Sequence, residues 1–248
     1  MSPRVVADPA VIPWLQADTP FPAVRNALRH PNGLLAAGGD LSPERLLAGY
    51  RQGIFPWFSE GDPILWWSPD PRMVLLPEEL KISRSLAKVL RNRPHEIRFD
   101  SAFQDVMTGC AAPRAGQPGT WITQEMRGAY EALHALGYAH SVETWLDGRL
   151  AGGLYGVALG RAFFGESMFT RERDASKMAL VALVERCKSE DIRLIDCQMH
   201  TAHLESLGAR EIPRREFARR LEDLVHYPKA PGRWTGIVGA VSNNVAAE

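Results

Sequence analysis

The chain has 248 residues, which is enough for one large domain or for a large and a small domain together. Hydrophobic residues make up 45% of it and charged residues 23%, as in an ordinary soluble globular protein. The formal net charge is zero at pH 7, so overall charge gives no attraction to nucleic acid, and any such partner needs a local basic patch.

The sequence patterns predict neither secretion nor membrane insertion. The first residues, MSPRVVADPAVIPW, lack the apolar core of a signal peptide, and the run MALVALV is too short to cross a bilayer. Cys110, Cys187 and Cys197 are an odd number of cysteines at wide spacings, which is typical of reduced thiols. We therefore expect a soluble cytoplasmic protein with no membrane partner.

Residues 1–70 are rich in proline, glycine and tryptophan and predict a small N-terminal domain. One short helix is expected there, because Ser42 is a favoured N-cap residue, Pro43 suits the first helical position and Gly53 follows the helix end. The composition changes after the sequence WWSPDPR, so we expect the domain boundary near residue 70.

From residue 72 onward, patterns typical of strands and of helices alternate. Strands are expected at 72–77, 95–100, 139–148, 149–160, 161–169 and 192–198, and helices at 82–92, 101–111, 123–137, 174–190, 200–208 and 218–225. Antiparallel hairpins mixed with crossing helices predict an α+β fold with a mixed sheet, in a second domain of residues 71–226. Residues 227–248 are expected to form a tail.

No metal or cofactor site is predicted. Cys197, His200 and His203 are close in sequence, but both histidines fall on one short helical segment with no fourth ligand nearby, unlike a structural zinc site. The glycines of AGGLYGVALG lie in a strand, which indicates the close approach of another backbone or of a ligand rather than a phosphate loop. The sequence TRERDASK, where acyl-coenzyme A enzymes hold a pyrophosphate, contains no glycine, which disfavours a coenzyme A site.

Five cations and no acid occur in the segment KISRSLAKVLRNR, which begins at residue 81. Lys81, Arg84, Lys88 and Arg91 are spaced by three, four and three residues, which places them on one side of a helix. Such a run is often only a solvated face, but the absence of interleaved acid favours phosphate binding. A second cluster, RREFARR, contains Glu216 and is the weaker candidate.

Aromatic residues gather in one proline-interrupted segment. Trp57, Trp66 and Trp67 lie within eleven residues, beside Phe55 and Phe58. Core packing is the usual role of such residues. Because the segment is irregular, an aromatic surface that stacks a base or another ring is the alternative.

Three polar side chains are expected near strand ends of one sheet. Asp196 and Gln198 are two residues apart on a predicted strand, so both side chains leave the same face. Glu166 stands in the apolar run AFFGESMF, where a lone carboxylate is costly to bury without a partner. Such groups are either hydrogen-bonded in a structural network or used in chemistry, and the residue pattern leaves both possibilities open.

Several long segments, in order, resemble the leucyl/phenylalanyl-tRNA–protein transferase family over residues of about 31–220. They are PNGLLAAGGDLSPERLLAGYRQGIFPWFSEGDPILWWSPDPRMVL, TWIT, AYEALHALGYAHSVETW, GGLYG, FFGESMF, ASKMAL, LIDCQ and HLESLGAREIPRREF. The resemblance implies transfer of leucine or phenylalanine from aminoacyl-tRNA to the α-amine of proteins that begin with Arg or Lys, creating an N-degron. It also implies a C-terminal domain similar to N-acetyltransferases and a reaction without metal, nucleotide or coenzyme A.

The resemblance also assigns functions to individual residues. The functional carboxylate of GES is Glu166 here, and the functional residues of DCQ are Asp196 and Gln198. We expect the Gln198 carbonyl to orient the acceptor amine, Asp196 to accept a hydrogen bond from the Gln198 amide and to supply negative charge, and Glu166 to face a cation of the acceptor.

The donor is expected to contact three further groups of residues. Its amino acid would lie among Leu154, Phe163, Met168 and Ile195, its terminal adenosine would be held by Trp57 and Trp121, and its acceptor stem would lie on Lys81, Arg84, Lys88 and Arg91. Two alternatives remain open on these residues. One is a non-catalytic RNA-binding module, and the other is a different transferase that uses aminoacyl-tRNA.

Overall fold

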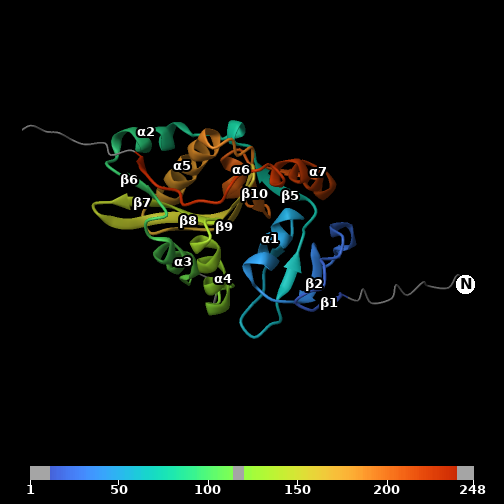
Figure 1. The fold of residues 1–248 in the computed structure, drawn as a ribbon. Helices are drawn as coiled ribbons and strands as arrows, with labels where there is room; N and C mark the ends of the chain where they lie inside the picture. The colour runs from blue at the N-terminus through green and yellow to red at the C-terminus, as the bar shows by residue number, and fades with distance from the viewer. Residues whose placement is uncertain (1–11, 114–119, 239–248) are drawn as a thin grey trace, which may run out of the picture.

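The computed structural model describes residues 12–113 and 120–238 and contains two β-sheets. The smaller sheet belongs to the N-terminal part and has the order β1-β2-β4-β3 (Figure 1). Its strands are β1 (Trp14–Leu15), β2 (Leu34–Gly38), β3 (Phe55–Pro56) and β4 (Leu65–Trp67). The pair β1–β2 is parallel and the other pairs are antiparallel, and a short 3-10 helix, η1 (Val24–Asn26), precedes β2.

Helix α1 (Pro43–Arg51) connects β2 to β3 and begins as the sequence predicts. The Ser42 hydroxyl accepts a hydrogen bond from the Arg45 N–H at 3.3 Å, Pro43 occupies the first helical position, and Gly53 follows the end with φ +72°. The apolar face of the helix is buried and includes Tyr50. This orientation carries the Tyr50 hydroxyl toward the second sheet.

The larger sheet forms the centre of the second domain, in the order β11-β5-β10-β9-β8-β7-β6-β12. Its strands are β5 (Arg72–Leu75), β6 (Glu96–Phe99), β7 (Ala139–Leu146), β8 (Arg149–Leu159), β9 (Ala162–Thr170), β10 (Leu194–Gln198), β11 (Arg210–Ile212) and β12 (Ile237–Val238). Strands β9 and β10 run parallel to each other, and the remaining neighbours are antiparallel. The expected α+β fold with a mixed sheet is confirmed, together with a small N-terminal part.

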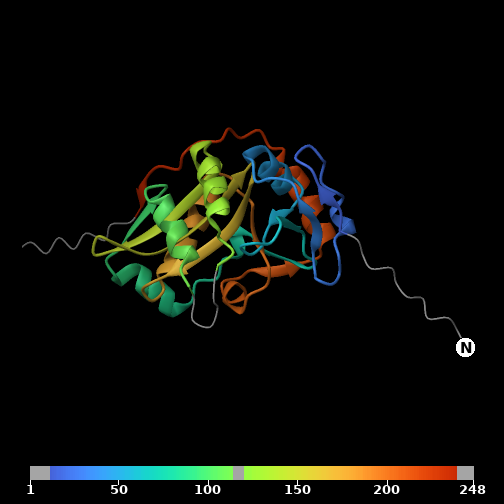
Figure 2. The same cartoon turned by 90° about the horizontal axis from the view of Figure 1, so that it is seen from below.

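Helices cover both faces of this sheet. Helix α5 (Ala175–Ser189) packs on one face with α2 (Arg84–Asn92) nearby, whereas α3 (Phe103–Ala111) and α4 (Gln124–Ala135) lie across the other face (Figures 1 and 2). Apolar clusters fill the two interfaces, which places each strand between two layers of helix. The smaller elements η2 (Pro77–Glu79), α6 (Ala202–Ser206) and α7 (Arg214–Val225) lie near β5 and β10.

The N-terminal part packs directly against the second domain. Helix α1 contacts both α4 and α7, and α7 in turn contacts β9. A Cβ atom on Gly53 would lie 2.6 Å from the Phe217 ring of α7, so only glycine permits this approach. The contacts bring α1 to the end of the sheet where β9 and β10 separate (Figure 1).

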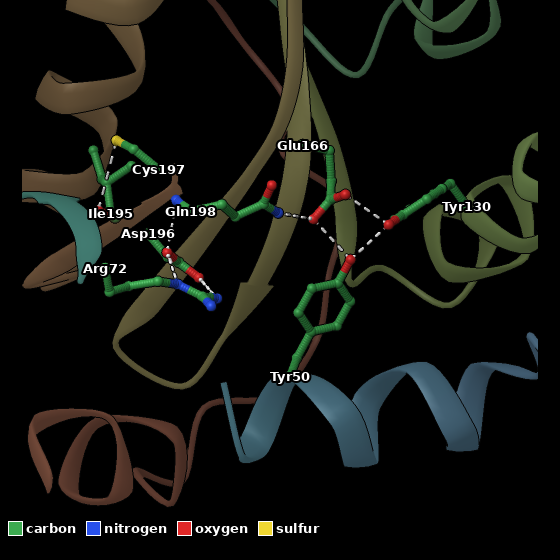
Figure 3. A network of polar contacts seen from close by, with 8 residues as sticks. All are labelled: Tyr50, Arg72, Tyr130, Glu166, Ile195, Asp196, Cys197 and Gln198. Carbon is green, nitrogen blue, oxygen red and sulfur yellow. Dashed lines mark hydrogen bonds and ion pairs between the residues drawn. The ribbon is translucent and has the colours of Figure 1, made fainter. Parts of the chain in front are cut away.

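A bulge in β9 determines how Glu166 is presented. In the pairing of β8 with β9, Tyr155 lies opposite Ser167 and Gly156 lies opposite Gly165. Glu166 is therefore the extra residue on β9, and such a bulge bends the strand and re-aims its side chain. The Glu166 side chain points to the face that α1 and α4 cover (Figure 3).

The structure differs from the sequence expectations at several boundaries. Helix α2 begins at Arg84 rather than at 82, α7 begins at Arg214 rather than at 218, and β11 was not expected. The expected tail is wrong for residues 227–238, because Trp234 is buried and β12 pairs with β6. The Trp234 ring stacks on His140 at a centroid distance of 4.2 Å, and its backbone N–H donates to Asp100. Figure 2 shows this segment in red along the edge of the domain.

Candidate active site

Glu166 is the centre of a hydrogen-bonded group at the junction of the two domains (Figure 3). Its side chain is 9% exposed and accepts three hydrogen bonds. Tyr50 Oη donates to Oε1 at 2.8 Å, Tyr130 Oη donates to Oε2 at 2.7 Å, and Gln198 Nε2 donates to Oε1 at 3.1 Å. The carboxylate thus has the partners that its burial requires.

The two tyrosines come from separate helices. Tyr50 lies on the buried face of α1, and Tyr130 lies on the buried face of α4, which α1 contacts. Their hydroxyl oxygens are 2.7 Å apart, so the two hydroxyls and Glu166 form a triangle of close oxygen contacts. The site is therefore built from both domains.

Asp196 forms a second buried group with Arg72. Strand β10 lies between β5 and β9, and Asp196 is paired with Val74 on one side and Phe164 on the other. Arg72 Nε donates to Oδ1 at 2.8 Å and Nη2 donates to Oδ2 at 2.6 Å, with the side chains 1% and 0% exposed. The guanidinium also lies against the rings of Phe55 and Phe217. Removing one partner of such a pair leaves a buried charge and typically costs about 3–5 kcal/mol.

Gln198 connects these two groups. Its φ is +63°, in the left-handed region, and the pairing of β10 with β5 shifts between Asp196 and Gln198. The Gln198 backbone N–H donates to Asp196 Oδ1 at 2.9 Å, while its side-chain Nε2 donates to Glu166. The expectation that Asp196 accepts from the side-chain amide is wrong, because the turned backbone presents its N–H to Asp196 instead.

The orientation of the Gln198 amide has a chemical consequence. With Nε2 held by Glu166, the carbonyl Oε1 forms no hydrogen bond to any residue that the structure describes. Gln198 is partly exposed, and Oε1 is an acceptor without an N–H or O–H partner. A donor group that reaches this end of β10 meets an oriented carbonyl oxygen.

Burial raises the pKa of Glu166 to about 7, and the negative charge of Asp196 adds to the shift. The hydroxyls of Tyr130 and Tyr50 and the charge of Arg72 act in the opposite direction. Burial also raises the pKa values of Tyr50 and Tyr130 well above the ordinary value, so both hydroxyls keep their protons. The triangle has three oxygen–oxygen contacts, and the two tyrosine hydroxyls supply one proton each. A protonated Glu166 supplies the third proton. When Glu166 is ionised, one of the three contacts has no proton between its oxygens.

The residues expected to hold the donor amino acid lie together. Leu154, Phe163 and Ile195 are buried in one apolar cluster, and the partly buried Met168 packs against it. Met168 also lines an adjacent cavity of about 790 Å³ at the end of β9. Met168 is therefore the member of the set that this cavity reaches.

The tryptophans expected to hold the adenosine are not brought together by any contact within the described residues. Trp57 is 38% exposed and packs edge-on against Trp67, whose indole N–H donates to the Trp57 carbonyl. Trp121 is half-buried and packs against the apolar cluster that contains Tyr130. Trp66, by contrast, is fully buried and donates to the Gly38 carbonyl, which is the core role.

The basic segment presents its cations to solvent. The spacing predicted Lys81 on the helix, but it lies three residues before α2 begins. Lys81, Arg84, Lys88 and Arg91 are all exposed, and within 12–113 and 120–238 none of them forms a salt bridge. Arg93 is different, because it pairs with Glu172 at 2.7 Å and donates to the Arg173 carbonyl. The four exposed cations remain available to a polyanion.

Among the residues that the structure describes, no cluster of three or more His, Cys, Asp or Glu side chains could hold a metal ion. His200 instead contacts Glu205 at 3.1 Å, and the Cys197 thiol points to the Ile195 carbonyl. In the same described ranges, no helix combines the length and the apolar character that crossing a bilayer requires.

Sequence reasoning missed Arg72, Tyr50 and Tyr130. Each lies within an otherwise ordinary element, at the start of a strand or on the apolar face of a helix. A single buried-face tyrosine is also common in protein cores, so the residue type gives no signal. Only the partner, Glu166, is conspicuous in the sequence, and its three hydrogen-bond donors come from positions 32 to 116 residues away.

The raised pKa of Glu166 predicts a pH-dependent stability. The folded protein holds the Glu166 proton up to about pH 7, whereas the unfolded chain releases it near the ordinary value of 4.5. The free energy of unfolding of the wild type should therefore fall, relative to Glu166→Gln, as pH rises from 4.5 to 7, and the difference should level off above pH 7. The expected loss is about 3 kcal/mol. Urea titrations of both proteins from pH 4.5 to 8.5 measure it, and a parallel pH dependence of the two would contradict it.

Two family models match most of the second domain and part of the N-terminal part. The family model "Leucyl/phenylalanyl-tRNA protein transferase" matches residues 74–222, and the model of that family's N-terminal domain matches residues 39–70. A solved structure described as L-PGS from Bacillus licheniformis is similar only weakly, with 10% identity, a TM-score of 0.36 and coverage of 65% of this chain and 52% of that one.

Relatives with the family name match almost the whole chain. Leucyl/phenylalanyl-tRNA–protein transferase of Nitrosomonas europaea is 64% identical over 90% of this chain and 95% of its own. The corresponding protein of Chromobacterium violaceum is 62% identical over 90% of this chain and 96% of its own. Since both the N-terminal part and the large sheet are matched, this chain belongs to the leucyl/phenylalanyl-tRNA–protein transferase family and is an aminoacyltransferase.

Proposed function

We propose that this enzyme transfers leucine or phenylalanine from its tRNA to the N-terminal α-amine of proteins beginning with Arg or Lys. The product would carry an N-degron, and the reaction would take place in the cytoplasm without a cofactor. The observation that supports the proposal is the pair of hydrogen bonds from Gln198, one to Glu166 and one to Asp196. Together they fix the Gln198 side chain and leave its carbonyl oxygen oriented and free.

The proposed reaction needs alignment more than activation. The α-amine nitrogen attacks the ester carbonyl carbon, a C–N bond forms, the C–O bond to the terminal ribose breaks, and the amine proton finally replaces the acyl group on that oxygen. A free α-amine has a pKa of about 7.7–8.0, so a useful fraction is neutral near pH 7. Alignment of two bound reactants contributes about 7–11 kcal/mol in the best cases.

In this proposal Gln198 Oε1 accepts a hydrogen bond from the acceptor amine and directs its lone pair toward the ester. Asp196 acts through Gln198. Both of its oxygens accept bonds from Arg72, and one also accepts the Gln198 N–H, so Asp196 maintains the turned backbone. Asp196 is therefore a positioning residue, and Gln198 is the group that touches the substrate.

Glu166 supplies the preference for a cationic acceptor. A carboxylate has about four acceptor positions, and three on Glu166 are filled, with one position left on Oε2. An acceptor cation that binds there favours the ionised carboxylate and offsets its burial. An acceptor without a cationic side chain does not offset the free-energy cost of ionising the buried Glu166 carboxyl.

The proposal is tested by single-turnover transfer of labelled leucine from Leu-tRNA to a peptide that starts with Arg. We expect transfer by the wild type and a loss of about a hundredfold in Gln198→Ala. A Lys188→Met variant, changed at the far end of α5, is the control and should match the wild type. Binding of tRNA without any transfer would instead support the RNA-binding module, and transfer of other amino acids at similar rates would support a different transferase.

The role of Glu166 is tested with Glu166→Gln, which keeps the shape and removes the charge. We expect kcat/KM to fall about ten- to hundredfold with Arg- and Lys-starting peptides, since a charge-assisted bond is lost. A Met-starting peptide, slow already, should change much less. Equal losses on all three peptides at an unchanged melting temperature would contradict the side-chain role and place the action of Glu166 on the α-amine.

Met168 is proposed to adapt the donor pocket to two shapes. In Met168→Ile the stiff β-branched side chain cannot move aside, so Phe transfer should slow more than Leu transfer. The ratio of the two kcat/KM values should change by about tenfold, within the range for one methylene in an apolar pocket. If both donors slow equally, Met168 only supports the cluster.

The exposed face of α2 is proposed to bind the acceptor stem. Reversing Lys81, Arg84 and Lys88 to Glu should raise the KM for Leu-tRNA and flatten its salt dependence, because fewer counterions are released. The matched control reverses Arg215 and Arg219 on α7, which are also exposed. A KM that keeps the same salt slope in both variants would remove this role from α2.

A further inference from the structure

A basic cavity lies beside the site, at the end of β9. Its volume is about 790 Å³, and it opens between the end of α3, the first turn of α5 and the surfaces of α2 and α6. Its lining includes Ser85, Met168, Arg173, Asp174, Ser176 and Lys177. Of the residues that line this cavity, the proposed reaction involves only Met168.

The lining of the cavity has an excess of positive charge. Arg171, Arg173 and Lys177 are its cations, and Asp174 is its one carboxylate. Asp174 contacts Lys177 Nζ at 2.8 Å and Arg173 Nε at 3.5 Å, so it holds both cations at the cavity wall. Burial lowers the pKa of His203, so this side chain is neutral at pH 7. An anionic ligand matches this wall.

The first turn of α5 provides hydrogen-bond donors. The helix has 15 residues and begins at Ala175, after Asp174 in the left-handed region at φ +65°, whose side chain does not cap it. The first N–H groups of a helix have no partner within it and carry partial positive charge. A Cβ atom on Gly152 would lie 3.0 Å from the Ser176 nitrogen, so the glycine allows β8 to pack this close to the turn.

Ser176 points to a ligand independently of the helix terminus. Its side chain is only 8% exposed, yet it lines the cavity. Its hydroxyl has no hydrogen-bond partner among the residues that the structure describes. Ser176 Oγ is not one of the buried side-chain atoms that lack a partner, so the hydroxyl is open to the cavity, where a phosphate oxygen would accept its proton.

The cavity connects the two places where the donor tRNA is proposed to bind. Its lining includes Met168, two residues from Glu166, and Ser85 on the basic helix α2. Arg93, the residue after α2, ties this helix to the cavity wall through Glu172 and the Arg173 carbonyl. A strand that runs from the helix to the site therefore passes the first turn of α5.

We propose that this cavity binds a backbone phosphate of the single-stranded 3′ end of the donor tRNA, held by the side chains of Ser176, Lys177 and Arg173 and by the backbone N–H of Lys177. The Ala175 N–H takes no part, because it donates to the Glu172 carbonyl at 3.1 Å. The inference rests on the proposed function, since it assigns a subsite to the same donor. A free anion would satisfy the same donors, but only a polynucleotide also reaches α2 and Met168.

The test compares donors with and without phosphate. In the double variant Ser176→Ala/Lys177→Met, kcat/KM for Leu-tRNA should fall at least about tenfold, because a charge-assisted bond and a hydroxyl bond are lost. With 3′-leucyl-adenosine, which has no phosphate, the change should be much smaller. The salt slope for Leu-tRNA should fall by about 0.7 for the lost contact.

A matched control lies at the other end of α5. Lys188 pairs with Glu185 three residues away, as Lys177 pairs with Asp174, but it does not line the cavity. Lys188→Met should therefore behave as the wild type with both donors. A loss of similar size with Leu-tRNA and with 3′-leucyl-adenosine, or no loss with either, would overturn the proposal.

Measurements of tRNA binding test the phosphate subsite independently of the proposed transfer reaction. The dissociation constants of uncharged tRNA and of tRNA trimmed of its single-stranded 3′ end are measured for the wild type and the double variant. The variant should bind intact tRNA about tenfold more weakly and trimmed tRNA as the wild type does. This result supports the phosphate subsite even if no amino acid is transferred. Equal affinities for intact tRNA would reject the subsite even if transfer is observed.

Discussion

The buried carboxyl of Glu166 is the constraint on which the rest of the site depends. An acid with so little access to water needs donors from several directions, and here they come from α1, α4 and β10. The hydrogen bond from Tyr50 commits the N-terminal part to one position against the large sheet. The same carboxyl therefore also aligns the two domains, and a shift of α1 would remove one of its three donors.

The Asp196–Arg72 salt bridge supports the backbone of Gln198. Gln198 adopts a left-handed backbone conformation, which is unusual for a residue with a side chain and needs support from its surroundings. The Asp196 carboxylate gives that support by accepting the Gln198 N–H, and Arg72 offsets the charge that this requires. Phe55 and Phe217 enclose the guanidinium from the N-terminal part and from α7, so three regions of the chain fix one amide group.

The sequence predicted the parts of this arrangement that depend on neighbouring residues. Capping at Ser42, the antiparallel hairpin of β7 and β8, and the isolation of Glu166 in an apolar run are all local patterns. The bulge that turns Glu166 and the left-handed backbone at Gln198 depend on strand pairing, which no local pattern records. The stacking of Trp234 on His140 likewise joins distant residues, so a segment that was expected to be a tail packs as part of the domain.

The two buried carboxyl groups of the site, Asp196 and Glu166, differ in how their negative charge is compensated. Asp196 forms a buried salt bridge with Arg72, whereas burial raises the pKa of Glu166 to about 7, so this carboxyl titrates near neutral pH. In the proposed reaction one carboxyl supports the backbone and the other meets the acceptor cation. A cation beside Glu166 would favour its ionised form, so the free energy of ionising this buried carboxyl would add to the distinction between cationic and neutral acceptors. The position for such a cation would be the open one on Oε2, because the other acceptor positions are filled by Tyr50, Tyr130 and Gln198.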